Sequence, residues 1–135
     1  MTIKRPEGTP QLCPYLYYRD VESALDVLTK WFGFEITNVR RGPDDQIFHA
    51  DALLDDAMIM IGPGMKEFGT AAVADPDAVH ANSYIYVDDV DAHFAAAKAA
   101  GATIRSEPET MPWGDRMYGA SDAEGQRFTF AQHVA

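Results

Sequence analysis

The feature that most constrains the fold of this chain is an internal repeat. The segment 15–24 (YLYYRDVESA) matches the segment 84–93 (YIYVDDVDAH), which lies 69 residues further along the chain. At the same offset, the segment 58–61 matches 127–130. Matched segments that follow one another in the same order in both halves indicate that one structural unit occurs twice.

Each repeat has the pattern of a strand, a helix and three more strands. Short runs rich in aromatic and β-branched residues, at 15–18 and 83–87, predict the first strands. A capping aspartate follows each run, and apolar residues at helical spacing predict helices over 21–32 and 90–100. The other strands are expected at 35–41, 46–53 and 57–61 in the first half and at 102–106, 115–121 and 127–132 in the second.

The predicted architecture is a single α+β domain over residues 1–135. It consists of two tandem βαβββ modules, at about 12–62 and 82–132, which a connector over 63–81 joins. The connector lacks periodicity, which fits either a functional flap or a disordered linker. With 135 residues, 47% of them hydrophobic, the chain can bury a core without disulfides, and Cys13 is its only cysteine.

Charge narrows the range of partners. The chain has 21 acidic and 11 basic residues, which give a net charge of −10. This balance argues against nucleic acids and anionic membranes, because both require clustered lysine and arginine. It fits a solvated acidic surface or the attraction of a cationic small molecule. The lone cysteine, and the lack of an apolar leader or a membrane-length apolar run, predict a cytoplasmic protein.

Two parts of the sequence carry a resemblance to a known family. They are PYLYYRDVESA at 14–24, leading to WFGFE at 31–35, and PWGDRMY at 112–118, followed by DAEGQRFTF at 122–130. These segments resemble the vicinal oxygen chelate superfamily, which includes glyoxalase I, extradiol dioxygenases and bleomycin-resistance proteins. The resemblance covers residues 12–132. It implies curved mixed β-sheets around a cleft with helices on the outer face, and it leaves the reaction open because this fold hosts several chemistries.

The resemblance also locates the positions where metal-dependent members hold a divalent ion. They fall on Cys13, Met60, Asn82 and Thr129. None of these is histidine, aspartate or glutamate, so the set supplies neither the charge nor the shared ligand preference that such an ion requires. We therefore predict a protein with no metal and no cofactor.

Strand alternation divides each sheet into a face that packs on its helix and a face that lines the cleft. On the first and last strand of each module we follow this alternation from the metal positions that the resemblance implies, and on the preceding strands we align His49 with Tyr118 in the repeat. The predicted ligand-binding residues are Tyr15, Tyr17, His49, Asp51, Met58, Met60, Tyr84, Tyr86, Arg116, Tyr118 and Arg127. Aromatic and thioether walls with a few polar groups are typical of small-molecule sites and favour a flat, conjugated ligand.

Histidines are the natural candidates for acid–base chemistry. His49 is the one candidate for a catalytic residue, because Asp51 lies two positions along the same strand and could orient its imidazole. We interpret His80, His93 and His133 as surface residues, too scattered to form a ligand cluster.

These observations leave several functions open. The favoured one, by similarity to the bleomycin-resistance branch, is a homodimer that sequesters a small aromatic or cationic molecule without a metal. One alternative is a metal-dependent enzyme of the glyoxalase or dioxygenase type. A second is a metal-free lyase or isomerase that uses His49 or a tyrosine. A third is a partner-binding module with a filled pocket.

Overall fold

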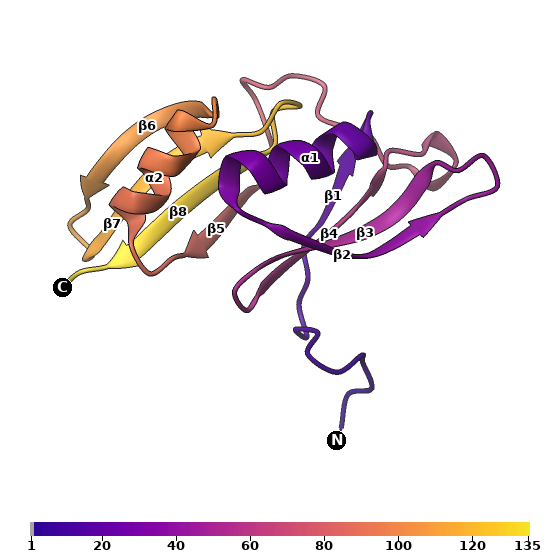
Figure 1. The fold of residues 1–135 in the computed structure, drawn as a ribbon, viewed down its shortest axis with the longest axis horizontal. Coiled ribbons are helices and arrows are strands. Elements are labelled where there is room, and N and C mark those ends of the chain that lie inside the picture. Colours follow the sequence, from indigo (N-terminus) through magenta and orange to yellow (C-terminus); the bar gives the residue numbers. More distant parts are fainter. Residues whose placement is uncertain (1) are drawn as a thin grey trace.

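A computed structural model describes residues 2–135. The first half forms β1 (Tyr15–Tyr18), α1 (Val21–Phe32), β2 (Glu35–Arg41), β3 (Ile47–Leu54) and β4 (Ala57–Pro63). A short 3-10 turn, η1 (Lys66–Phe68), follows in the connector. The second half forms β5 (Asn82–Tyr86), α2 (Val90–Ala99), β6 (Thr103–Thr110), β7 (Asp115–Ser121) and β8 (Arg127–His133). Both halves therefore have the predicted βαβββ order (Figure 1).

The strands form two four-stranded mixed sheets, with the orders β1-β4-β3-β2 and β5-β8-β7-β6. In each sheet the first strand of the module runs parallel to the last, and the other neighbours are antiparallel. The parallel register also repeats, because Tyr15 lies opposite Met60 and Tyr84 lies opposite Thr129. The predicted α+β fold of two tandem modules is confirmed.

The helices begin and end where local chemistry favours it. Asp20 accepts a hydrogen bond from the Ser23 amide, and Asp89 accepts one from the Ala92 amide, so each aspartate caps a first helical turn. The turn after α1 needs a left-handed residue, and Gly33 supplies it with a φ of 81°. The buried face of α1 consists of Val21, Ala24, Leu25, Leu28 and Phe32.

The antiparallel registers of the two modules differ by one residue. Ala50 of β3 lies opposite Ile61, whereas Tyr118 of β7 lies opposite Phe130. Ile61 and Phe130 are 69 positions apart, but Ala50 and Tyr118 are only 68 apart. The structural counterpart of Tyr118 is therefore Ala50 and not His49, and this slip turns Tyr118 to the other face of the sheet.

The predicted cleft orientation of Arg116 and Tyr118 is wrong for this reason. Tyr118 is fully buried under α2, and its hydroxyl donates to Nδ1 of His93 at 2.6 Å. Arg116 pairs with Asp91 on α2 at 3.0 Å. His93 is not a surface residue either, because its Nε2–H donates to the Phe32 carbonyl at 2.9 Å and burial lowers its pKa.

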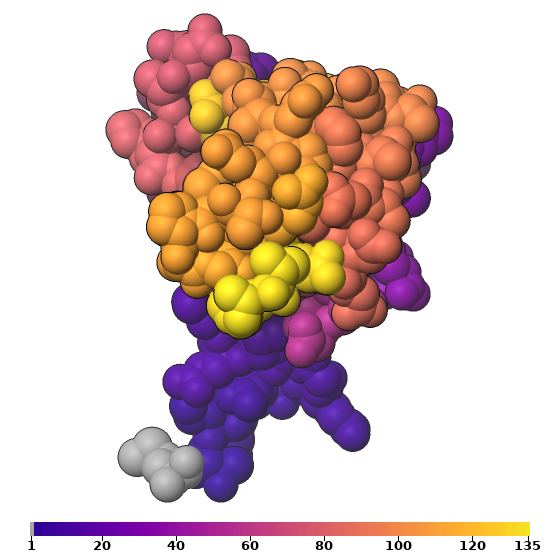
Figure 2. All heavy atoms as spheres, turned by 90° about the vertical axis from the view of Figure 1, so that its left-hand side faces the viewer, coloured from indigo at the N-terminus to yellow at the C-terminus, as the bar shows by residue number. Residues whose placement is uncertain are grey.

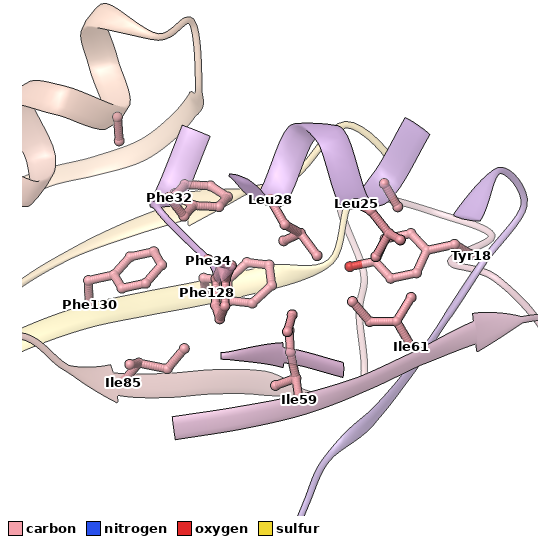
Figure 3. Close-up of a cluster of buried hydrophobic side chains, with 14 of the residues drawn as sticks. Tyr18, Leu25, Leu28, Phe32, Phe34, Ile59, Ile61, Ile85, Phe128 and Phe130 are labelled. Carbon is pink, nitrogen blue, oxygen red and sulfur yellow. The ribbon is translucent and has the colours of Figure 1, made fainter. Parts of the chain in front are cut away.

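One hydrophobic core joins the two modules. Phe32 at the end of α1 packs against Phe128 and Phe130 of β8, with ring centroids 5.4 and 5.2 Å apart. Figure 3 shows these rings beside Ile59 of β4 and Ile85 of β5, so both sheets contribute to the same cluster. The burial of such an apolar cluster is the main stabilising contribution to a fold of this kind.

A polar junction also ties the second module to the end of β1. The buried Tyr18 hydroxyl donates to Oδ2 of Asp122 at 2.5 Å. The Arg19 and Asp20 amides donate to the Glu124 carboxylate at 2.7 and 2.9 Å. The turn before β8 is thus fastened to the first module by hydrogen bonds to charged groups, which are the stronger kind.

The connector packs on the surface of the second module. Figure 2 shows it gathered beside β6 and β8, and its Pro76 carbonyl accepts hydrogen bonds from Arg105 and Arg127. The N-terminal segment extends away from the body of the molecule in the same view. Across residues 2–135, each helix is too short or too polar to cross a membrane.

Candidate functional site

The face of the first sheet opposite α1 carries a pair of stacked tyrosines. The Tyr15 and Tyr17 rings of β1 lie with centroids 5.0 Å apart and planes at 28°. Gly62 of β4 lies opposite Tyr17 and leaves the space that the Tyr15 ring occupies, because a Cβ at Gly62 would lie 2.7 Å from the Tyr15 hydroxyl oxygen. The strand register and this glycine together place two aromatic faces side by side.

A chain of hydrogen bonds holds the Tyr15 hydroxyl. It donates to Nδ1 of His49 at 3.0 Å, and Nε2–H of His49 donates to Oδ1 of Asp51 at 2.8 Å. This assignment follows because a carboxylate only accepts. Oδ2 of Asp51 accepts from the Asn38 amide at 3.1 Å. Burial, with the nearby Tyr17 and Asp51, raises the pKa of Tyr15, which keeps this phenol protonated.

The stacked tyrosines line a cavity of about 590 Å³, which we call the aromatic cavity. Its wall consists of Tyr15, Leu16 and Tyr17, the connector residues 71–75 and 78–81, and Gln126. Most of this wall is apolar, since the connector contributes mainly alanines and valines to it. The volume falls within the 300–1,000 Å³ that is usual for small-molecule pockets.

The corresponding face of the second sheet holds a different cluster. The hydroxyls of Tyr84 and Tyr86 donate to Oδ2 of Asp115 at 2.7 and 2.8 Å, and Nδ1–H of His133 donates to Oδ1 at 2.8 Å. The hydrogen bond from Tyr84, with those from His133 and Tyr86, lowers the pKa of Asp115, which is 3% exposed. Tyr84 and Tyr86 remain exposed beside Trp113.

Sequence reasoning missed Asp115 and His133. Strand alternation in β7 and β8 could have found them if β7 had been aligned one residue out of step with the repeat. That alignment places Asp115 and Met117 on the cleft face of the sheet. Met117 confirms this register, because the Tyr84 hydroxyl also lies 3.5 Å from its sulfur. Asp115 lies opposite His133 in the sheet.

The predicted site residues therefore fall into separate groups. Tyr15, Tyr17, His49 and Asp51 are together on the first sheet, and Met60 pairs with Tyr15 in the strand register. The aromatic cavity contains neither Tyr84 nor Tyr86 of the second sheet. Met58, Arg116, Tyr118 and Arg127 complete the predicted set: Met58 contacts Cys13, Arg127 contacts the connector, and the other two lie under α2.

The residues at the metal positions that the resemblance implies do not fit a divalent ion. The Asn82 amide donates to the Thr129 hydroxyl at 2.9 Å, and the Cys13 sulfur lies 4.0 Å from the sulfur of Met58. An amide, a hydroxyl, a thiol and a thioether give no anionic oxygen or imidazole for a divalent ion. Over residues 2–135, the histidine, cysteine and acidic side chains form no group of three that could hold one.

Paired βαβββ modules, each with a four-stranded mixed sheet, define a recognisable class of protein. The chain belongs to the Glyoxalase/Bleomycin resistance protein/Dioxygenase superfamily, whose sequence profile matches residues 11–130. An uncharacterized protein of Mycobacterium bovis is 31% identical over 132 residues, which cover 93% of this chain and 84% of that protein.

Solved structures show the same fold. TioX from Micromonospora sp. ML1 has a TM-score of 0.76 and 28% identity, over 93% of this chain and 99% of that chain. TnmS3, an antibiotic binding protein from Streptomyces sp. CB03234, has a TM-score of 0.72 and 19% identity, over 99% of each chain.

Proposed function

We propose that this protein binds a small, planar aromatic or cationic molecule in the aromatic cavity, without a metal. The observation that carries the proposal is that the stacked pair of Tyr15 and Tyr17 lines a mostly apolar cavity of about 590 Å³. Tyrosine faces stack on conjugated rings and attract cations through the ring quadrupole. The net charge of −10 favours the approach of a cationic ligand.

Two observations favour binding over acid–base catalysis by His49. His49 does not line the aromatic cavity, and its two ring nitrogens hold the Tyr15 hydroxyl and the Asp51 carboxylate. The raised pKa of Tyr15 disfavours a phenolate that could act as a base. In the proposed function His49 and Asp51 orient the Tyr15 ring as part of the cavity wall.

The comparisons support the proposal at the level of the superfamily. TnmS3, which shares the fold, is described as an antibiotic binding protein, so this fold can serve as a binding scaffold with an organic ligand.

We also propose a homodimer, because Tyr84, Tyr86 and Trp113 expose aromatic surface that a second copy would cover. Light scattering should give the mass of two chains; the mass of one chain would contradict the dimer.

The cavity can be tested with proflavine, a planar cationic dye. Proflavine should bind the wild-type protein, and Tyr17→Ala should weaken binding by about 1–3 kcal/mol because a stacking face and its buried area are lost. The measurement is a fluorescence titration of both proteins. Phe68→Ala, which removes an exposed aromatic ring outside the cavity, is the matched control and should bind as the wild type does. Equal affinity of Tyr17→Ala and wild type would exclude the aromatic cavity as the site.

A further inference from the structure

A second pocket, of about 410 Å³, lies between the connector and the face of the second sheet. Gly119 of β7 lines the pocket, and a side chain at this position would crowd Ser106. A Cβ there would lie 3.0 Å from the Ser106 hydroxyl oxygen. The polar residues that line the pocket are His80, Asn82, Arg105, Ser106, Arg127 and Thr129. It shares a wall, residues 79–81, with the aromatic cavity.

The pocket is positive although the chain is strongly acidic. The guanidinium groups of Arg105 and Arg127 converge on one acceptor, the Pro76 carbonyl oxygen, at 3.0 and 2.9 Å. No aspartate or glutamate lines this pocket. Asp77, which is highly exposed, is the one carboxylate in residues 2–135 that pairs with either arginine, at 3.5 Å from Arg105. Two like charges so close together with a single solvated counter-charge favour an anion beside them.

Several donors around the arginines are unused. The Nε–H of Arg127 is buried and has no acceptor among residues 2–135. The Thr129 hydroxyl oxygen accepts from the Asn82 amide, and the Ser106 hydroxyl oxygen accepts from the Gly119 amide. Each hydroxyl therefore keeps its own hydrogen to donate. A buried donor without a partner is costly, and an acceptor bound in the pocket would relieve that cost.

We infer that this pocket binds the carboxylate or phosphate group of a small anionic molecule. Guanidinium groups suit both anions, because their planar array of N–H donors matches two oxygens at once. Arg105 and Arg127 supply the charge, and the Thr129 and Ser106 hydroxyls supply neutral donors. The four side chains that would bind the anion do not line the aromatic cavity, so the inference does not depend on the function proposed for that cavity.

The test is a calorimetric titration of the whole protein with benzoate and, separately, with inorganic phosphate. At least one of them should bind the wild-type protein, and the one that binds more tightly identifies the anion. Arg127→Met should weaken that binding roughly tenfold or more, since a hydrogen bond to a charged group contributes at least that much. The affinity of Arg127→Lys for the anion should fall between those of the wild type and Arg127→Met, because lysine keeps the charge and loses the paired donors.

The matched control is Arg19→Met. Arg19 also donates to a connector carbonyl, that of Val73, but it lies outside the pocket. The Arg19→Met variant loses the same charge and a similar connector contact, so the affinity of this variant for the anion should stay within about twofold of wild type. Thermal melts of each variant show that it is folded. The inference would be overturned if neither anion binds at 10 millimolar, on the order of the weakest specific affinities. It would also be overturned if Arg19→Met weakens anion binding as much as Arg127→Met does.

Discussion

Replacing Phe128 with alanine should lower the free energy of unfolding by about 3–5 kcal/mol, which is the usual cost of deleting a buried aromatic ring. Phe128 is 1% exposed, and its ring packs against Phe32 and Phe34 from the first module and Phe130 from its own strand. The substitution therefore opens a cavity at the place where the two modules share their core. Chemical denaturation followed by circular dichroism measures the change.

The control for this prediction is again Phe68→Ala. Phe68 lies in the connector and is 74% exposed, so the same deletion should change stability by less than about 0.5 kcal/mol. A loss below about 1 kcal/mol for Phe128→Ala would mean that the shared core does not hold the modules together.

Replacing Asp122 with alanine should cost about 3 kcal/mol, because it leaves several buried donors without acceptors. The carboxylate accepts from the Tyr18 hydroxyl at 2.5 Å and from the Glu124 and Gln126 amides at 3.1 and 3.0 Å. Tyr18→Phe removes one of these donors together with its need for an acceptor, so it should cost less, about 1 kcal/mol. Denaturation curves of the two variants, compared with wild type, give both values.

Asp122→Asn separates the charge from the hydrogen bonds. Burial raises the pKa of Asp122 above its ordinary value of 3.8, so the folded protein holds this proton more tightly than the unfolded chain does. The wild-type protein should therefore lose stability relative to Asp122→Asn as the pH rises from below 3.8 through the folded-state pKa. If the stability difference between the two proteins does not change with pH, or changes in the opposite direction, burial does not raise the pKa of this carboxylate.

Much of the fold could be predicted from the sequence, because its determinants are local. The aspartate caps and the helical spacing of apolar residues in α1 each act within a few residues, and the repeat shows the same local signals in both halves of the chain. Strand β6 runs on to Thr110, beyond the predicted end at 106, because it continues to pair with β7 as far as Arg116. Such an extension depends on a partner strand, which the local pattern does not contain.

The site was predictable on the first sheet and less so on the second. Tyr15, Tyr17, His49 and Asp51 follow from alternation once the cleft-facing side of each strand is assigned, and the structure brings them together. On β7 a single-residue slip in the repeat reversed the faces, which misplaced Tyr118 and hid Asp115. Arg105 escaped notice because the acceptor that it shares with Arg127 is a backbone carbonyl of the connector, and no side-chain pattern marks such an acceptor.

The central claim is that the aromatic cavity binds its ligand without a metal. The most direct measurement combines elemental analysis of protein purified without a metal-affinity tag with a proflavine titration before and after chelation. We expect no stoichiometric metal, unchanged proflavine affinity and an unchanged melting temperature. A tightly bound ion, by contrast, stabilises a fold by about 4 kcal/mol when its free concentration is a thousandfold above its dissociation constant. One metal ion per chain, whose removal abolishes proflavine binding and lowers the melting temperature, would contradict the account and favour a metal-dependent enzyme.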